Sequence, residues 1–311
     1  MRILIVPASP KTSRATIQAL LRSPNNPNTP IQIRGLYRNL DRIPAEFQDK
    51  DDSIFEPYRG DLTVPATLNF HGFDTVFFVL PPCFDGGQLT EWATTASTNI
   101  RLAIQRSGTV KRLVLLSSMG AELEGGTGEI MTNHISEEIL RDAACEVVII
   151  RCAYFMENWA TSLPTVRQKE TPYLETVITP VDFAVPMVAV EDIGVKSAEC
   201  ILSTERKESK PYVIELHGPR EYASVDVRRA FEKVLGRAVE LRPVEKENLT
   251  EYFAGFLPEA AVGPFVEMTL SFLPGGVMHN DLGKKEEVRL MRGRVELEEV
   301  VAGLVKGEEG E

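Results

Sequence analysis

RILIVPASPKTSRATIQALL, at residues 2–21, starts as a short apolar run and continues as a helical pattern. Residues 3–6 are apolar throughout, which predicts a buried β-strand. Three aliphatic residues then recur at the spacing of one helix face, namely Ile17, Leu20 and Leu21. A strand, a tight polar turn and a helix in this order are typical of the first unit of a dinucleotide-binding α/β fold.

The turn between that strand and that helix normally carries three glycines, but here the three positions hold Pro7, Pro10 and Ser13. The glycines permit a tight turn, close approach of the backbone to a pyrophosphate, and close packing of the helix on the strand. Two prolines also remove main-chain N–H groups of the kind that bind anions at a helix start. With Ser9 as N-cap and Pro10 as first helical residue, the sequence predicts a helix start that is complete without a ligand.

The composition is that of a soluble globular protein, with 43% hydrophobic and 25% charged residues among 311. The 34 Lys and Arg against 45 Asp and Glu give a net charge of −11. No basic cluster offers a site for nucleic acid or an anionic membrane, so we expect neither as a partner. No run of 18 apolar residues and no signal-peptide core is present, and we expect a cytoplasmic protein.

Cysteines and histidines are spread along the chain without ligand spacing. The cysteines contain no C-x-x-C pair, which indicates reduced thiols rather than a disulfide framework or a zinc site. The four histidines are also widely separated, and we expect no metal.

Strand-like and helix-like segments alternate through the first half of the chain. Further strands are predicted at residues 31–37, 74–80, 112–116 and 147–151, with another ending near 60–62. Helices are predicted at 88–107, closed by Gly108, and around 136–144. The alternation predicts an α/β protein with a Rossmann-like, doubly wound parallel sheet.

The alternation breaks near residue 154, which divides the chain into two predicted parts. We assign residues 1–153 to the Rossmann-like domain, with segments near 186–203 and 211–218 returning to it. Residues 154–185 and 219–311 are predicted to form a smaller α/β C-terminal lobe that binds substrate over the carboxyl edge of the sheet. It includes a helix at 224–235 and an apolar segment at 253–277, which forms a lid, packs the lobe or makes a dimer face.

Eight short segments together resemble the NmrA-like branch of the atypical short-chain dehydrogenases/reductases. They are LYRN at 36–39, GDL at 60–62, VLPP at 79–82, LLSS at 115–118, IRCAYFMEN at 150–158, VEDIG at 190–194, HGP at 217–219 and LGR at 235–237. They occur in family order and cover nearly the whole chain. Members of the branch include NADPH-dependent reductases, redox-sensing regulators and fungal secondary-metabolite enzymes, and the last type is the one this chain resembles.

The resemblance implies NADP(H) as cofactor, whereas the replaced glycines argue against it, and both alternatives stay open. Arg38 occupies the position at which family members place the arginine for the 2′-phosphate, a role that suits a guanidinium. Pro81 lies in a loop that passes near the cofactor in family members. The altered turn still offers N–H groups, hydroxyls and charge to a phosphate, through Ser9, Lys11, Thr12 and Ser13.

Redox members of the wider superfamily carry a Tyr-x-x-x-Lys pair on the helix after the fifth strand. The tyrosine protonates a carbonyl oxygen, and the lysine lowers the pKa of that tyrosine. Alignment on Glu137 and Leu140 places Asn133 at the lysine position and Glu129 at the tyrosine position. The resemblance therefore implies that the groups for hydride transfer have been replaced.

Four residues are candidates for acid–base or orienting groups: His134, Ser118, Asn133 and Tyr154. His134 lies beside Asn133, and it serves either as an acid or base, a role to which imidazoles are suited, or only as a surface or capping residue. Ser118 ends the fifth strand and either orients a substrate oxygen or caps the following turn. Tyr154 follows the sixth strand, where the family lines its substrate pocket, or belongs to the core.

Three functions are compatible with these residues. The first is an enzyme that performs redox-neutral isomerisation, cyclisation or elimination on a small apolar oxygenated substrate in secondary metabolism. The second is an NADPH-dependent oxidoreductase that uses the altered phosphate loop. The third is a nucleotide-sensing or protein-binding regulator, and in each case we expect a monomer or a homodimer.

Overall fold

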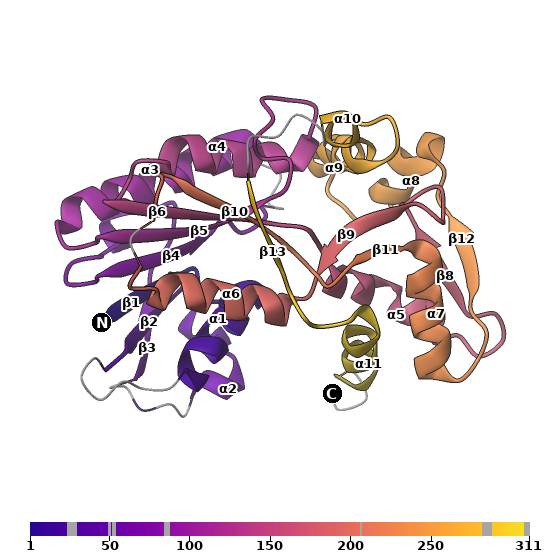
Figure 1. Cartoon of the computed structure of the whole chain (residues 1–311), viewed down its shortest axis with the longest axis horizontal. Coiled ribbons are helices and arrows are strands. Elements are labelled where there is room, and N and C mark those ends of the chain that lie inside the picture. Colours follow the sequence, from indigo (N-terminus) through magenta and orange to yellow (C-terminus); the bar gives the residue numbers. More distant parts are fainter. Residues whose placement is uncertain are drawn as a thin grey trace.

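The protein, described by a computed structural model over residues 1–23, 30–48, 51, 54–83, 88–205, 207–281 and 288–307, is built on one eight-stranded sheet. The strand order is β13-β10-β6-β5-β4-β1-β2-β3, and every adjacent pair is parallel (Figure 1). The order of the strands reverses between β1 and β4, which is the switch point where doubly wound sheets bind ligands. The predicted Rossmann-like sheet is confirmed.

The strands of this sheet are short. Their bounds are β1 (Arg2–Val6), β2 (Gln32–Tyr37), β3 (Phe55–Arg59), β4 (Thr75–Val79), β5 (Arg112–Ser118), β6 (Glu146–Cys152), β10 (Tyr212–His217) and β13 (Arg289–Arg292). Apolar runs predicted the inner strands because a parallel strand is covered on both faces and reads as continuously hydrophobic.

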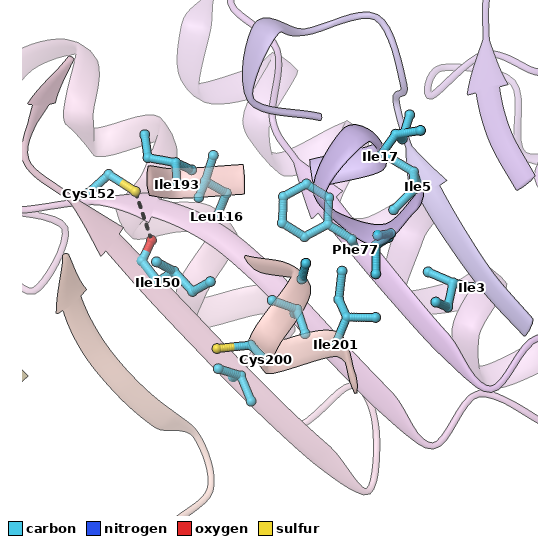
Figure 2. Close-up of a cluster of buried hydrophobic side chains, with 14 of the residues drawn as sticks. Ile3, Ile5, Ile17, Phe77, Leu116, Ile150, Cys152, Ile193, Cys200 and Ile201 are labelled. Atoms are coloured by element: carbon cyan, nitrogen blue, oxygen red, sulfur yellow. Dashed lines mark hydrogen bonds between the residues drawn. The ribbon is translucent and has the colours of Figure 1, made fainter. Parts of the chain in front are cut away.

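Two helix layers cover the sheet. Helices α1 (Lys11–Arg22) and α6 (Val190–Leu202) lie on one face, and α3 (Leu89–Ser107) and α4 (Met131–Leu140) lie on the other (Figure 1). Side chains alternate along each strand, so neighbouring residues of β1 belong to the two different cores. Figure 2 shows the core beneath α1 and α6, where the buried Cys152 thiol donates to the carbonyl of Ile150 at 3.9 Å.

Helices α1 and α6 approach each other closely at Gly194. A Cβ atom on Gly194 would lie 2.5 Å from the carbonyl carbon of Ala15, so no side chain fits there. We expect Gly194→Ala to lower the free energy of unfolding by about 1–3 kcal/mol in urea titrations, because the helices must separate. Gly303→Ala is the control, since a Cβ atom on Gly303 in helix α11 (Leu297–Gly307) would have no atom within 4 Å, and alanine there should be stabilising. Equal effects at the two positions would contradict the close contact.

The smaller lobe follows β6 and has its own core (Figure 1, right). Its strands form a β11-β9-β7 sheet and a β12-β8 pair, with bounds β7 (Tyr154–Phe155), β8 (Tyr173–Thr176), β9 (Ala184–Val188), β11 (Glu221–Ala223) and β12 (Glu240–Pro243). Helix α7 (Ser224–Leu235) has the predicted bounds, and it ends at Gly236, whose φ of 66° is left-handed. Gly108 ends α3 in the same way, with φ 63°.

The remaining helices are short except for α9, which has 14 residues. They are η1 (Leu40–Arg42), α2 (Ala45–Gln48), η2 (Pro65–Thr67), η3 (Gly128–Ile130), η4 (Met156–Ser162), α5 (Leu163–Val166), η5 (Lys246–Asn248), α8 (Leu249–Ala254), α9 (Glu259–Phe272) and α10 (Val277–Asp281). Residues 259–279 have the length and composition of a membrane span, with a mean hydropathy of 1.2 and 28% burial. The stretch is divided, however, because α9 ends at Phe272 and Gly275 has a left-handed φ of 88°.

Two predicted boundaries differ from the structure. Helix α4 begins at Met131 and ends at Leu140, where the sequence predicts a helix around 136–144. The glycine-rich loop ends earlier than expected, because η3 leads directly into α4, and a tight turn from Ala143 N to Leu140 O closes the helix. Strand β13 also joins the large sheet, although the sequence assigns residues 219–311 to the smaller lobe.

Candidate functional site

The turn after β1 lies tightly against β2. The Ala8 N–H donates to the carbonyl of Leu36 at 2.8 Å, and Ala8 fills the space that a side chain on Gly35 would occupy. Helix α1 begins at Lys11, preceded by Pro10 with an extended ψ of 147°, and no side chain caps it. The prediction that Ser9 caps this helix, with Pro10 inside it, is therefore wrong.

With Pro10 before the helix, the start of α1 offers main-chain N–H groups to a ligand. The first intrahelical bond runs from Arg14 N to Pro10 O at 2.9 Å, and the N–H groups of Lys11, Thr12 and Ser13 have no acceptor in the described part of the chain. Thr12 and Ser13 are buried, Lys11 and Ser9 are exposed, and the Ser13 hydroxyl has no hydrogen-bond partner among the described residues. Three free N–H groups, a positive helix end and an unsatisfied hydroxyl fit a bound anion such as a phosphate.

Arg38 and Pro81 follow the carboxyl ends of β2 and β4, on either side of β1. Arg38 is exposed, and no salt-bridge or hydrogen-bond partner for it exists among the residues the structure describes. The carbonyl of Pro81 accepts a hydrogen bond from the Trp92 indole at 2.9 Å, which fixes the loop after β4 against α3. The structure thus places Arg38, Pro81 and the start of α1 at one edge of the sheet.

Glu157 joins the starts of α1 and α6. Its Oε1 accepts the Val190 N–H at 2.8 Å, and its Oε2 is buried without a partner in the described ranges. Burial raises the pKa of Glu157, while the hydrogen bond from Val190 and the charge of Lys11 act in the opposite direction. Glu157 and Lys11 line one end of an open cavity of about 1270 Å³ that extends along α1 and α6.

His134 and Ser118 are both hydrogen-bonded to Ala121, in the turn that follows β5. The His134 Nδ1 lies 2.9 Å from the carbonyl of Ala121, and the Ala121 N–H donates to the Ser118 carbonyl at 3.2 Å. Because a carbonyl only accepts, Nδ1 is the donor of this hydrogen bond, and in a neutral imidazole Nε2 would then be the acceptor nitrogen. The Ser118 hydroxyl donates to the Met119 carbonyl at 3.0 Å. His134 is therefore oriented as a base, and Ser118 has a local partner.

Asn133 and Glu129 lie on the same end of α4 as His134. Asn133 is one turn before Glu137, and Glu129 precedes the helix in η3. Burial raises the pKa of Glu129, and a hydrogen bond with Thr132 partly offsets this. A carboxyl with a raised pKa keeps its proton to higher pH and can act as an acid.

The raised pKa of Glu129 gives a pH-dependent stability. The folded protein holds this proton more tightly than the unfolded chain, so ionisation above an ordinary carboxyl pKa of about 4.3 destabilises the fold. We expect Glu129→Gln to be more resistant to urea than wild type at pH 7, with the difference disappearing as the pH falls below about 4. Glu124→Gln is the control, because Glu124 is exposed in the same loop. A Glu129→Gln variant that is less stable at pH 7 would refute the effect.

A buried ionic cluster ties α4 to β5 and β6. Arg151 donates through Nε and Nη2 to Glu137 at 3.0 and 2.6 Å, and its Nη1 lies 3.3 Å from Glu122. The Ser117 hydroxyl also donates to Glu137 at 2.6 Å. Burial alone would lower the pKa of Arg151, but the hydrogen bond and charge of Glu137, with Glu122 and Glu215, raise it overall. We call Ser117, Glu122, Glu137 and Arg151 the Arg151 cluster.

Little in the sequence indicates this cluster. In the sequence, Glu137 serves only to align its helix with the corresponding helix of the resembling family. Arg151 is one residue of the segment IRCAYFMEN at 150–158. The sequence feature that points to the cluster is Arg151, a charged residue directly after the apolar run at residues 147–150. Its partner lies on a helix, and only the folded sheet shows that the two meet.

Tyr154 is part of the interior of the smaller lobe. Its ring lies 6.1 Å from Trp159 and 6.4 Å from Phe272. Burial, together with the nearby Tyr252, raises the pKa of Tyr154 to about 12, and Asn158 hydrogen-bonds its hydroxyl. At neutral pH Tyr154 is therefore a proton-bearing hydrogen-bond donor, two residues beyond the strand that pairs with Ser118.

The apolar segment of the smaller lobe covers the loop around His134. A side chain on Gly128 would meet the backbone of α9 at Pro264 O and Met268 N, and one on Gly120 would meet Met278 of α10. Helices α9 and α10 therefore lie directly on the loop between β5 and α4. In the described ranges no group of three or more His, Cys, Asp or Glu residues is arranged to hold a metal.

Comparison with known proteins identifies the fold. No protein-family model and no curated protein matches this sequence. Among solved structures, the NADP(H) complex of Citrobacter sp. triphenylmethane reductase matches with a TM-score of 0.73 and 18% identity, over 98% of this chain and 100% of that one. The NADPH complex of an Escherichia coli quinone oxidoreductase matches with a TM-score of 0.69 and 16% identity, over 98% and 99%.

The negative transcriptional regulator NmrA matches equally well, with a TM-score of 0.69 and 17% identity over 99% of this chain and 97% of that one. At these low identities the structural similarity shows the fold alone. The chemistry has to be argued from individual residues of this chain. The chain has the Rossmann-like fold of the triphenylmethane reductase, the quinone oxidoreductase and NmrA.

Proposed function

We propose that this protein is an enzyme that performs redox-neutral acid–base chemistry on a small apolar oxygenated molecule. His134 is the general base, Asn133 and Ser118 orient the substrate, and Tyr154 donates a hydrogen bond from the smaller lobe. The reaction class is an isomerisation, cyclisation or elimination that starts with removal of a proton beside a carbonyl group, and we place it in secondary metabolism. We place the substrate beside His134, next to α9 and α10, whose apolar side chains suit such a molecule.

One observation carries this proposal. The His134 Nδ1 donates to the carbonyl of Ala121, in the turn after β5, and a neutral imidazole held in this way would accept a proton at Nε2. Asn133 beside it stands where the resembling redox enzymes place a lysine, and an amide carries no charge to lower a tyrosine pKa.

The experiment is an exchange assay that needs no knowledge of the natural substrate. A panel of small aryl ketones and lactones is incubated with the protein in D₂O without cofactor, and deuterium next to the carbonyl is followed by NMR. We expect exchange above the buffer rate for at least one compound, unchanged by added NADPH. Turnover only with NADPH consumption would favour a reductase, and no exchange in any compound would favour a regulator.

The open start of α1 supports a second candidate, an NADPH-dependent oxidoreductase. Lys11, Thr12 and Ser13 would hold the pyrophosphate through their N–H groups, and Arg38 would pair with the 2′-phosphate. NADPH, when bound, supplies a hydride. The free N–H groups and the unpaired guanidinium in the described part of the chain favour this candidate, and the lack of a tyrosine–lysine pair opposes it.

Calorimetry with NADPH decides whether the dinucleotide binds. For this candidate we expect Arg38→Ala to weaken NADPH binding by about 10- to 100-fold, because a charged hydrogen bond is lost, and to leave NADH binding unchanged. Arg42→Ala is the matched control, since Arg42 is another exposed arginine close by in η1. No NADPH binding at about 1 mM would reject the oxidoreductase.

A further inference from the structure

Strand β13 forms one edge of the large sheet. It pairs with β10 on its inner side, and no other strand in the described part of the chain pairs with its outer side. The Gly293 N–H donates to the His217 carbonyl at 2.7 Å, so alternate residues face β10. Main-chain groups of a parallel strand alternate in direction, which leaves the N–H and C=O of Leu290 and Arg292 directed outward. Such an edge is a template for a further strand.

The edge is basic in an acidic protein. Arg289, Arg292 and Arg294 are exposed, and none of them lies within salt-bridge distance of a carboxylate among the residues described. Arg289 donates to the Tyr212 hydroxyl at 2.9 Å and Arg292 to the Gly218 carbonyl at 3.2 Å, so both are held near the strand. The three exposed arginines make this edge locally basic in a chain with a net charge of −11.

A cavity lies beside the same edge. Arg289 and Met291 of β13 line the cavity of about 1270 Å³, together with apolar residues of α6, β10 and α11 and with charged residues of both signs in α1, in α6 and in the segment after α6 (Val195, Ile214, Leu304, Lys196, Glu199, Lys207). Side chains of a strand alternate between faces, so a strand added to β13 would direct every second side chain over this cavity. Leu290 is 47% exposed on the opposite face of the edge.

We propose that the edge of β13 binds an extended acidic peptide segment of another protein by strand addition. The main chain of that segment would pair with Leu290 and Arg292, its apolar side chains would lie over the part of the cavity lined by Val195, Ile214 and Met291, and its carboxylates would pair with Arg292 and Arg294. The charges decide the occupant. A second copy of this chain would place arginines opposite arginines at β13, and the other edge, β3, contains Pro57, which has no N–H to donate. This proposal is independent of the enzymatic function.

The probe is a fluorescein-labelled hexapeptide of alternating valine and glutamate, with binding followed by fluorescence polarisation. We expect saturable binding to the full-length protein that is lost in Leu290→Pro, which removes an outward N–H, and retained in Leu290→Ala. Because Leu290→Pro alters the strand, a hexapeptide with N-methylated valines is the second test and leaves the protein unchanged. It should not bind.

Charge reversal tests the choice of partner. The double variant Arg292→Glu, Arg294→Glu should bind the acidic peptide at least about tenfold more weakly than wild type. It should also bind a valine–lysine hexapeptide, which wild type does not. Arg141→Glu, an exposed arginine on the C-terminal side of α4, should change neither. Absence of binding at about 1 mM peptide, or binding that survives N-methylation, would overturn the proposal. A dimer in sedimentation that Leu290→Pro dissociates would overturn it in favour of a second copy.

Discussion

Replacement of His134 by glutamine is expected to lower the rate of cofactor-free deuterium exchange by about 10²- to 10⁴-fold, the usual contribution of a positioned general base. Glutamine keeps a polar side chain of similar length in place of the imidazole that donates to the Ala121 carbonyl, but its amide nitrogen is not basic. The fold should therefore be preserved while the proton acceptor is lost. The measurement is the exchange rate of the best ketone of the panel, with circular dichroism to confirm folding.

His71 provides the matched control. Its Nδ1 also lies against a main-chain carbonyl, that of Ser107 at 3.3 Å, but the residue belongs to the loop before β4, at the opposite end of the sheet. His71→Gln should leave the exchange rate unchanged. Equal rates for wild type and His134→Gln would remove His134 from the chemistry and leave Glu129 as the neighbouring titratable group at the start of α4.

Replacement of Arg151 by methionine is expected to lower the free energy of unfolding by about 3–5 kcal/mol. The change removes the cation of the Arg151 cluster and leaves the buried carboxylate of Glu137 facing that of Glu122. Both carboxylates then lose a charged partner in an environment that solvates them poorly. Urea unfolding at neutral pH measures the loss.

Two further variants separate this effect from simple loss of packing. Adding Glu137→Leu to Arg151→Met should restore part of the stability, because an apolar pair costs less than an unpaired buried charge. Arg141→Met breaks an exposed pair with Glu138 and should cost at most about 0.5 kcal/mol. A double variant that is less stable than the sum of its single changes would contradict the electrostatic explanation.

The sheet could be predicted because most of its strands and the helices beside it are marked by residues within the same segment of sequence. The apolar runs of β4, β5 and β6 reflect burial on both faces, and Gly108 and Gly236 mark helix ends through a conformation that glycine adopts readily. Strand β13 could not be predicted in this way. Its sequence RLMR is only four residues long and has neither an apolar run nor a period of two, and it becomes a strand because it pairs with the edge of β10.

The candidate site could be predicted in part. Sequence reasoning selects His134 and Ser118, and the structure brings both to one turn, although their roles stay a prediction. The capping role of Ser9 is wrong because the φ of a proline suits both a helix and an extended chain, and the extended ψ of Pro10 is set by the packing of Ala8 against β2. The Arg151 cluster depends on the orientation of α4, which no local pattern contains.

The contact between Gly194 and Ala15 also has a consequence for synthesis on the ribosome. Helix α1 is among the first elements made, yet the helix that packs beside it ends at Leu202. Until then the apolar face of β4, β5 and β6 lacks its cover, and a nascent chain of about 150 residues exposes a surface that favours aggregation. Cotranslational folding of the sheet must therefore wait for the second half of the chain, and residues 1–153 alone are a poor choice for expression.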